Sequence, residues 1–453
     1  MKTSLHKNKN LVFLALIGYL GILAATQTAY GGRLMNLRWV ALSILLVVSG
    51  WYWLTMRAQR QSGLLLDKST GILLLYFLST FLTVIFAENP LFSGSRWASH
   101  AMMLIIFLVF LRQNLTMGRI QKILVILKII IGVLLLFSIL NPAPQTIYDD
   151  FKVFRGAMGN ANTMGQIAAI GVVIYFHSFL IARNKRIRYL EAVLACGAIG
   201  IVWWTGSRSA MISLMTGIGL IFYFYRHRMH RKVFLGIFLF CFVVVTFPTL
   251  PGEVKRFVSK TGDVPTVFSR GVITKSRSDV WSASWKGFGD RPLFGWGFGA
   301  DSSIPKDWTL RLSAIGIVER DAVNDFLFML EGCGVVGFGA YLLLVYIVWR
   351  QKPTRRQVSI LRLTNYSRLN LKGNYFTMNH GYAIMFTLAV SLLVLVQFDN
   401  TALSGGNFIS VILWLSVGAA GALRKEFLSN EFAMYHYFST GAQRIQKEAS
   451  VAC

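Results

Sequence analysis

The feature that most constrains this chain is the recurrence of apolar segments about as long as a bilayer's hydrocarbon core is thick. A helix needs about 17–25 predominantly apolar residues to cross that core. Twelve segments of roughly this length follow one another: 11–30, 39–56, 70–87, 97–111, 123–140, 163–182, 189–206, 209–225, 233–248, 324–349, 382–398 and 406–423. We therefore predict an all-α polytopic membrane protein with about 12 transmembrane helices.

Composition and charge distribution support this prediction. Of the 453 residues, 55% are hydrophobic and 14% are charged, whereas soluble domains carry about a quarter charged residues. Taken alternately from the N-terminus, the connections and tails on one side hold 28 Lys and Arg, and the short connections on the other hold 6. Such an excess marks cytoplasmic loops. We therefore expect both termini in the cytoplasm, and we interpret the net charge of +27 as a topology signal rather than a nucleic-acid-binding surface.

The predicted spans divide one integral membrane domain, residues 1–453, into loops of unequal length. The large outer loop is 249–323, between the ninth and tenth spans, while 350–381 and the tail 424–453 are cytoplasmic. Three of the four cysteines fall within spans and Cys453 is the last residue. We therefore expect no disulfide in the outer loop.

The large outer loop contains 11 Lys and Arg and 8 Asp and Glu. Its stretch 276–289 has helical spacing and places Trp281 and Trp285 four residues apart, on one face. We expect this helix to lie along the membrane surface, which indole rings favour. The later Gly295-x-Gly297-x-Gly299 follows no predicted strand, which argues against a nucleotide-binding loop. It indicates a bend that lets the backbone approach a ligand or a neighbouring helix.

Arginines on the predicted outer side are the strongest candidates for ligand binding. They are Arg155, Arg208, Arg270, Arg277 and Arg291. A guanidinium stays charged and grips phosphate oxygens with two parallel donors, as a diphosphate leaving group requires. The alternative is that these arginines bind lipid headgroups or carboxylates. Arg208 is the strongest candidate because it lies in a tight Thr-Gly-Ser-Arg-Ser turn, and Arg277 is next.

The candidates for acid–base chemistry are Asp321 and Asp325, which flank Asn324 where the large loop enters the tenth span. If the helix has begun by Asp321, the two carboxylates share one face. A partly buried carboxylate there is suited to act as a general base, and the alternative is an ordinary acidic first helical turn. His100 is the histidine nearest the outer side. Asp149 and Asp150 are a weak candidate for cation binding, so we expect no metal site.

Several short motifs follow one another in an order that is typical of a known family. They are Gly159–Asn162, Thr205–Ala210, Arg277 with Trp281, Pro292–Gly297, and Asn324–Phe326 followed by Glu331–Gly337. Together they resemble the bacterial O-antigen ligase and O-antigen polymerase family, which includes exopolysaccharide polymerases. The similarity covers roughly residues 155–340 in motifs and the whole chain in topology.

The resemblance implies an inverting glycosyltransferase of the bacterial inner membrane that needs neither metal nor cofactor. Its donor would be an undecaprenyl-diphosphate-linked glycan at the periplasmic face. Its acceptor would be a growing exopolysaccharide or O-antigen polysaccharide, or lipid A–core. By motif, Arg208 and Arg277 are implied to bind the diphosphate.

The chain departs from the family at one position. Many members have histidine immediately before the asparagine that starts the tenth span, and here that residue is Val323. Either Asp325 or Asp321 replaces this base, or the acceptor needs less activation, or activity has been lost. The departure slightly favours a polymerase over a ligase.

A transporter or lipid-linked glycan flippase of twelve spans is the alternative function. Two-half transporters usually have a long inner loop between spans six and seven, but here that connection is only Arg183–Arg188. Charged residues within the spans are also few, whereas proton and ion relays usually need several. We therefore favour the glycosyltransferase.

Overall fold

The computed structural model describes residues 2–28, 30–34, 36–60, 68–112, 115–141, 154–158, 160–182, 184–225, 277–300, 324–352, 374–397 and 407–424. Its elements are α1 (Lys2–Thr26), η1 (Gly31–Leu34), α2 (Leu37–Arg60), α3 (Lys68–Ile85), α4 (Pro90–Leu104), η2 (Ile105–Leu111), α6 (Met117–Leu140), η4 (Gly156–Met158), α7 (Ala161–Ile181), α8 (Lys185–Thr205), α9 (Arg208–Tyr225), α12 (Arg277–Asp290), α14 (Asp325–Arg350) and α16 (Asn374–Val396). A last helix spans Phe408–Arg424. Every regular element in these ranges is helical, which confirms the all-α class for the described residues.

Seven described helices are long and apolar enough to cross a membrane. They are Leu37–Thr55, Pro90–Leu111, Met117–Leu140, Ala161–Ile181, Lys185–Thr205, Arg208–Tyr225 and Asp325–Arg350, and shorter apolar helices span Asn10–Thr26, Thr70–Ile85, His380–Val396 and Phe408–Arg424. Each corresponds to a predicted span. The predicted span 233–248 lies outside the described residues, so the total of twelve stays a prediction, as does the topology.

Asparagine caps fix the first turns of several membrane helices. The side-chain oxygens of Asn89, Asn160, Asn184 and Asn324 accept hydrogen bonds from backbone N–H groups of α4, α7, α8 and α14. Asparagine at this position satisfies N–H groups that lack a partner in the helix. Because of its cap, α4 begins at Pro90 rather than at the predicted residue 97, and His100 lies in its third turn.

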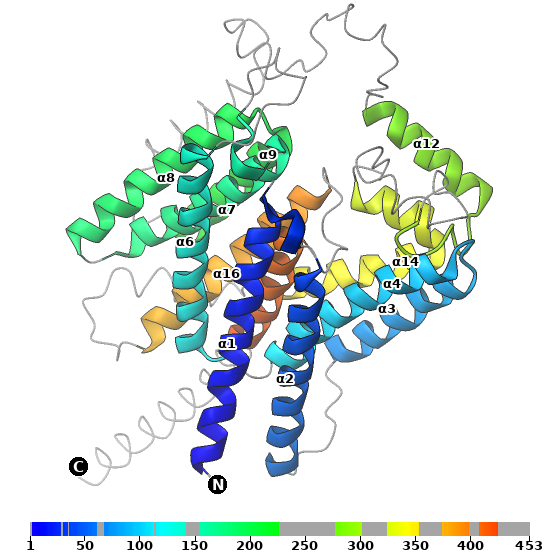
Figure 1. The fold of residues 1–453 in the computed structure, drawn as a ribbon, viewed down its shortest axis with the longest axis horizontal. Coiled ribbons are helices and arrows are strands. Elements are labelled where there is room, and N and C mark those ends of the chain that lie inside the picture. The colour runs from blue at the N-terminus through cyan, green and yellow to red at the C-terminus, as the bar shows by residue number, and fades with distance from the viewer. Residues whose placement is uncertain are drawn as a thin grey trace, which may run out of the picture.

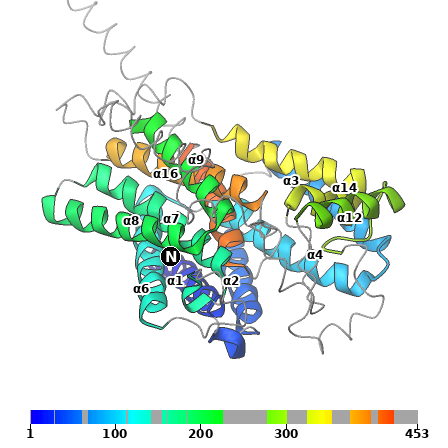
Figure 2. The ribbon, with the colours of Figure 1, turned by 90° about the horizontal axis from the view of Figure 1, so that it is seen from above.

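The helices form groups that both views of the molecule separate. Figures 1 and 2 show α6, α7 and α8 on one side and α3, α4, α12 and α14 on the other, with α1 and α2 between them. Within the first group α7 is the most enclosed, since 78% of its span is buried, and it contacts α6, α8, α9 and α16. In the second group α14 packs against both α3 and α12. The predicted ligand-binding arginines therefore come from two parts of the fold.

Specific polar contacts join helices of the first group to one another and the neighbouring α9 to α16. The Lys128 ammonium on α6 lies 2.5 Å from the Glu191 carboxylate on α8. The hydroxyls of Ser213 on α9 and Ser391 on α16 are 2.9 Å apart, and each also donates to the other residue's carbonyl. Gly217 lets α9 approach α7 and α16, because a Cβ there would lie 2.5 Å from Val173 and 3.1 Å from the Ser391 hydroxyl.

Candidate functional site

Arg208 starts α9 in a turn whose shape is set by its neighbours. Helix α8 ends at Gly206, which has a left-handed φ of 61°. Two residues later Arg208 begins α9 with its side chain exposed. Thr205 and Ser207 are both buried against Gly165 of α7, where a Cβ would lie 2.7 Å from each side chain. The turn therefore presents a guanidinium beside the amide groups and positive dipole end of a helix, an arrangement that suits an anion.

Arg155 belongs to a segment that is attached to the same turn. The Phe154 amide donates to the Trp204 carbonyl at 3.1 Å, and the two rings stack at 4.6 Å. Gly156 follows with a φ of 55° and opens the buried helix η4. The structure thus brings the backbone that carries Arg155 to the end of α8 next to Arg208.

The other predicted arginines lie elsewhere or outside the described residues. Arg277 is the first residue of α12, which confirms the helix predicted over 276–289. Helix α12 contacts α14, whereas α9 contacts α7, α8 and α16. Arg270 is outside the described residues. The structure therefore places Arg208 and Arg277 on different helix groups (Figure 1).

Arg291, the fifth predicted arginine, contacts the protein itself. Its guanidinium lies 3.7 Å from the Glu88 carboxylate and 4.3 Å from the ring centroid of Trp296. Glu88 belongs to the turn between α3 and α4. Arg291 thus connects the segment after α12 with that turn.

The glycine-rich stretch 291–300 is a bend that docks onto α14. Gly295, Gly297 and Gly299 have φ values of +66°, +117° and +74°, which L-residues with side chains rarely adopt. A Cβ at Gly295 would meet the Glu331 carbonyl, and one at Gly299 would meet the Arg96 side chain. The predicted approach of this backbone to a neighbouring helix is confirmed.

The docked stretch fills a break in α14. Gly334 has a φ of 60° and a ψ of −168° inside the helix, so the bonds from residues 335 and 336 back to 331 and 332 are lost. The loop replaces them, since the Trp296 and Gly297 amides donate to the Glu331 and Gly332 carbonyls at 3.1 and 2.7 Å. In return the Val335 and Val336 amides donate to the Pro292 and Leu293 carbonyls at 2.9 and 3.3 Å. These four backbone groups are thus satisfied, as a membrane environment demands.

The break folds the first turns of α14 back onto the rest of the helix. The Phe326 ring lies 6.0 Å from Phe338 and 5.8 Å from Tyr341, although 15 residues of straight helix would span about 22 Å. Asn324 caps the helix by accepting from the Phe326 and Leu327 amides at 2.8 and 3.2 Å. Helix α14 begins at Asp325, and the shared face of Asp321 and Asp325 stays a prediction. Asp321 and Val323 lie outside the described residues.

Asp325 is fully buried rather than partly buried as predicted. Asp325 lies near Tyr76 of α3 and Tyr341 of α14. The Tyr76 hydroxyl lies 3.0 Å from Nε2 of His100, whose ring packs against Phe298 of the docked stretch at 5.5 Å. Folding back α14 therefore brings two predicted acid–base candidates, Asp325 and His100, into one buried cluster.

Sequence reasoning missed Tyr76, Glu88 and Trp296. Tyr76 carries no charge that would mark it as a polar group within a predicted span, unlike Asp, Glu, Lys, Arg and His. A buried tyrosine hydroxyl nevertheless needs a partner. The signal for Trp296 was its position between two glycines that require special backbone angles. No pattern in the sequence indicated that Glu88 pairs with Arg291.

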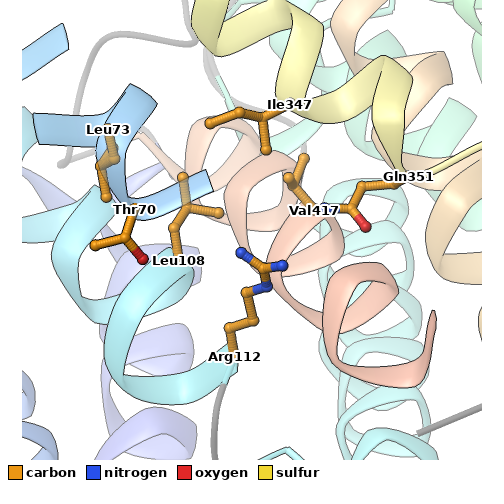
Figure 3. A pocket seen from close by; sticks show the side chains of 7 residues that line it. All are labelled: Thr70, Leu73, Leu108, Arg112, Ile347, Gln351 and Val417. Atoms are coloured by element: carbon orange, nitrogen blue, oxygen red, sulfur yellow. The ribbon is translucent and has the colours of Figure 1, made fainter. Parts of the chain in front are cut away.

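The described residues contain no group of three His, Cys, Asp or Glu side chains placed to hold a metal ion, and Asp149 and Asp150 lie outside them. Figure 3 shows a small cavity of about 10 Å³ near the other end of α14. It is lined by Thr70, Leu73, Leu108, Arg112, Ile347, Gln351 and Val417. This volume holds about one water molecule, so the cavity is not a substrate site.

A comparison with known protein families supports the resemblance that the sequence motifs indicated. Residues 192–342 match the family model described as O-antigen ligase. No curated protein matches the chain. The matched segment begins in α8, contains Arg208, Arg277 and Arg291, and ends in α14 beyond Asp325. The resemblance inferred from the sequence motifs is therefore confirmed over residues 192–342, where this multi-pass membrane protein is similar to the O-antigen ligase family.

Proposed function

We propose that the protein transfers a glycan from an undecaprenyl-diphosphate-linked donor to an acceptor hydroxyl at the periplasmic face of a bacterial inner membrane. The acceptor is a growing exopolysaccharide or O-antigen chain, or lipid A–core. The reaction inverts the anomeric centre and uses no metal. The acceptor oxygen bonds to the anomeric carbon as the bond to the diphosphate oxygen breaks, and the diphosphate leaves with the electron pair.

The observation that carries this proposal is the exposed Arg208 at the first residue of α9, inside the family-matched segment. A guanidinium and a helix N-terminus favour the same ligand, a phosphate group. Arg155 lies on the segment attached to the same turn. Arg277 is proposed to reach the diphosphate from α12, with Arg270 as a further ligand.

Asp325 is the proposed general base in place of the histidine that Val323 replaces. Its carboxylate is fully buried, so the acceptor hydroxyl reaches it only when the side chains that cover it move apart. In the closed arrangement the carboxylate is shielded from water, which protects a reactive site from side reactions. Asp325→Asn keeps the shape and removes the basicity, and we expect transfer to fall by about 10²–10⁴-fold.

The experiment that tests the proposed donor site compares two arginine-to-lysine variants, one at the first residue of α9 and one in the first turn of α8. Arg208→Lys keeps a positive charge but loses the two parallel donors. We expect polymer or ligated product to fall by about 10²–10³-fold, the usual effect of removing one donor to a developing anion. Arg186→Lys is the matched control, because Arg186 is also exposed but lies in the first turn of α8.

Membranes with equal amounts of each variant are assayed for product. Wild-type levels for Arg208→Lys would rule out diphosphate binding by this residue. The acceptor is identified in the same assay by offering free repeat units and lipid A–core separately.

A further inference from the structure

We propose that Trp296 is a positioning residue, which holds α12, the helix that begins at Arg277, in register with α14, the helix that begins at Asp325. This inference rests on the proposed function, in which α12 supplies a donor ligand and α14 supplies the base. The reaction needs both helices at a fixed separation. Trp296 contacts α12, α14 and the turn between α3 and α4 through its side chain and its backbone together.

Trp296 joins three separate parts of the fold through hydrogen bonds. Its indole Nε1 donates to the Gly287 carbonyl of α12 at 2.9 Å. Its backbone amide donates to the Glu331 carbonyl at the break of α14 at 3.1 Å, and its own carbonyl accepts from the Glu88 amide at 3.4 Å. The indole N–H is therefore a side-chain link from the docked stretch to α12.

Arg291 and Glu88 hold the indole in place. The Arg291 guanidinium covers the Trp296 ring at 4.3 Å and approaches the Glu88 carboxylate at 3.7 Å. A cation over an indole face is attracted by the ring, so this contact restrains the indole. We therefore assign to Arg291 the role of positioning Trp296. This role takes the place of the diphosphate binding that the sequence suggested for Arg291.

The backbone and side-chain links of Trp296 can be separated by substitution. The docked stretch is attached to α14 by four backbone hydrogen bonds, which any residue at position 296 except proline can keep. Trp296→Phe keeps the apolar ring and removes only the N–H that reaches Gly287. The variant should therefore keep the broken helix intact and loosen α12, which then keeps its own contacts with α14 and the hydrogen bond from the Arg291 amide to the Phe288 carbonyl.

A misplacement of about 1 Å far from the reacting atoms can lower a rate by about 10²-fold. We expect Trp296→Phe to lower kcat by at least about tenfold and to raise KM for the lipid-diphosphate donor. KM for the acceptor should stay unchanged, because Asp325 keeps its surroundings. Hydrogen exchange of the α12 amides should quicken, while exchange in α14 should not.

Trp97→Phe is the matched control. This substitution also removes one indole hydrogen bond, from Trp97 Nε1 to the Thr80 hydroxyl at 3.0 Å. That bond joins α4 to α3 and does not involve α12. We expect Trp97→Phe to leave donor KM and α12 exchange at wild-type values. Glu88→Gln, which weakens the support of Arg291, should show the Trp296→Phe pattern in milder form.

The exchange measurement uses the full chain in detergent and does not depend on activity. Unchanged α12 exchange in Trp296→Phe, or kinetics that match those of Trp97→Phe, overturns the positioning role. If the wild-type protein forms no glycosidic bond, the proposed function fails, and the link between α12 and α14 is still decided by exchange. If Trp296→Phe does not accumulate, Glu88→Gln decides by the same two readouts.

Discussion

At the scale of single residues, glycine and tryptophan in the stretch 291–300 determine the shape of the candidate site. The sequence indicated a bend there, and the positive φ angles of Gly295, Gly297 and Gly299 confirm it. The sequence did not show that the bend fills a break at Gly334, because that contact joins segments about 40 residues apart.

Gly334→Ala tests the break directly. Its φ of 60° and ψ of −168° lie in a region that is essentially restricted to glycine and costs other residues about 1–3 kcal/mol. A Cβ would also meet the Leu293 carbonyl. We expect a loss of stability of at least about 2 kcal/mol, measured as a lower unfolding temperature in detergent, together with loss of transfer.

Gly339→Ala on the same helix is the control. A Cβ at Gly339 meets nothing within 4 Å, so stability should stay the same or rise, because alanine favours the helix. Equal stability of the two variants would show that the break is not required.

At the scale of elements, the membrane helices of the first group pack through small residues and a few polar pairs. Lipid tails are as apolar as leucine, so close backbone approach and interhelical hydrogen bonds drive association instead. Hydropathy located these helices well, since it depends on local composition. It placed the starts of α7 and α8 too late, because their asparagine caps precede the predicted apolar runs by three to five residues.

Gly217→Ala should disrupt the contact of α9 with α7 and α16. The added methyl group would lie 2.5 Å from Val173 and 3.1 Å from the Ser391 hydroxyl, and such overpacking costs about 1–3 kcal/mol. The control is Gly219→Ala, two residues along α9, where a Cβ meets nothing within 4 Å. The unfolding temperature should fall for Gly217→Ala only. A fall for both variants would mean that stability depends on glycine anywhere on α9 rather than on this contact.

The ion pair between Lys128 and Glu191 should stabilise the attachment of α6 to α8. Glu191→Gln leaves the ammonium without its charged partner, and breaking a buried pair costs about 3–5 kcal/mol. Since the Lys128 side chain keeps 23% exposure, we expect a loss near or below the lower end of that range. The double variant Lys128→Met with Glu191→Met should recover most of it, and a double variant less stable than Glu191→Gln would refute the pairing.

At the scale of the whole molecule, sequence and structure agree on the all-α class but not on how the site is assembled. Apolar run length and ordered motifs are local properties, so the all-α class and the O-antigen ligase resemblance followed from the sequence. The burial of Asp325 depends on α14 folding back at Gly334. The separation of Arg208 from Arg277 depends on which helices pack together. Neither arrangement leaves a periodic pattern in the sequence.

The predicted orientation places both termini in the cytoplasm and residue 290 outside. Reporter fusions at residues 290 and 360 should report opposite sides of the membrane, because α14 lies between them. The Lys and Arg residues of the loop 350–381 favour the cytoplasmic side. A shared side would refute the orientation and with it the periplasmic placement of the site.

The most direct test of glycan transfer uses the purified wild-type protein in liposomes with an undecaprenyl-diphosphate-linked repeat unit as donor. The account predicts a new glycosidic bond in the product and one free undecaprenyl diphosphate for each bond formed, in the presence of a metal chelator. Both are measured by mass spectrometry. Movement of the intact donor between leaflets with no new glycosidic bond would contradict the account and identify the protein as a flippase instead.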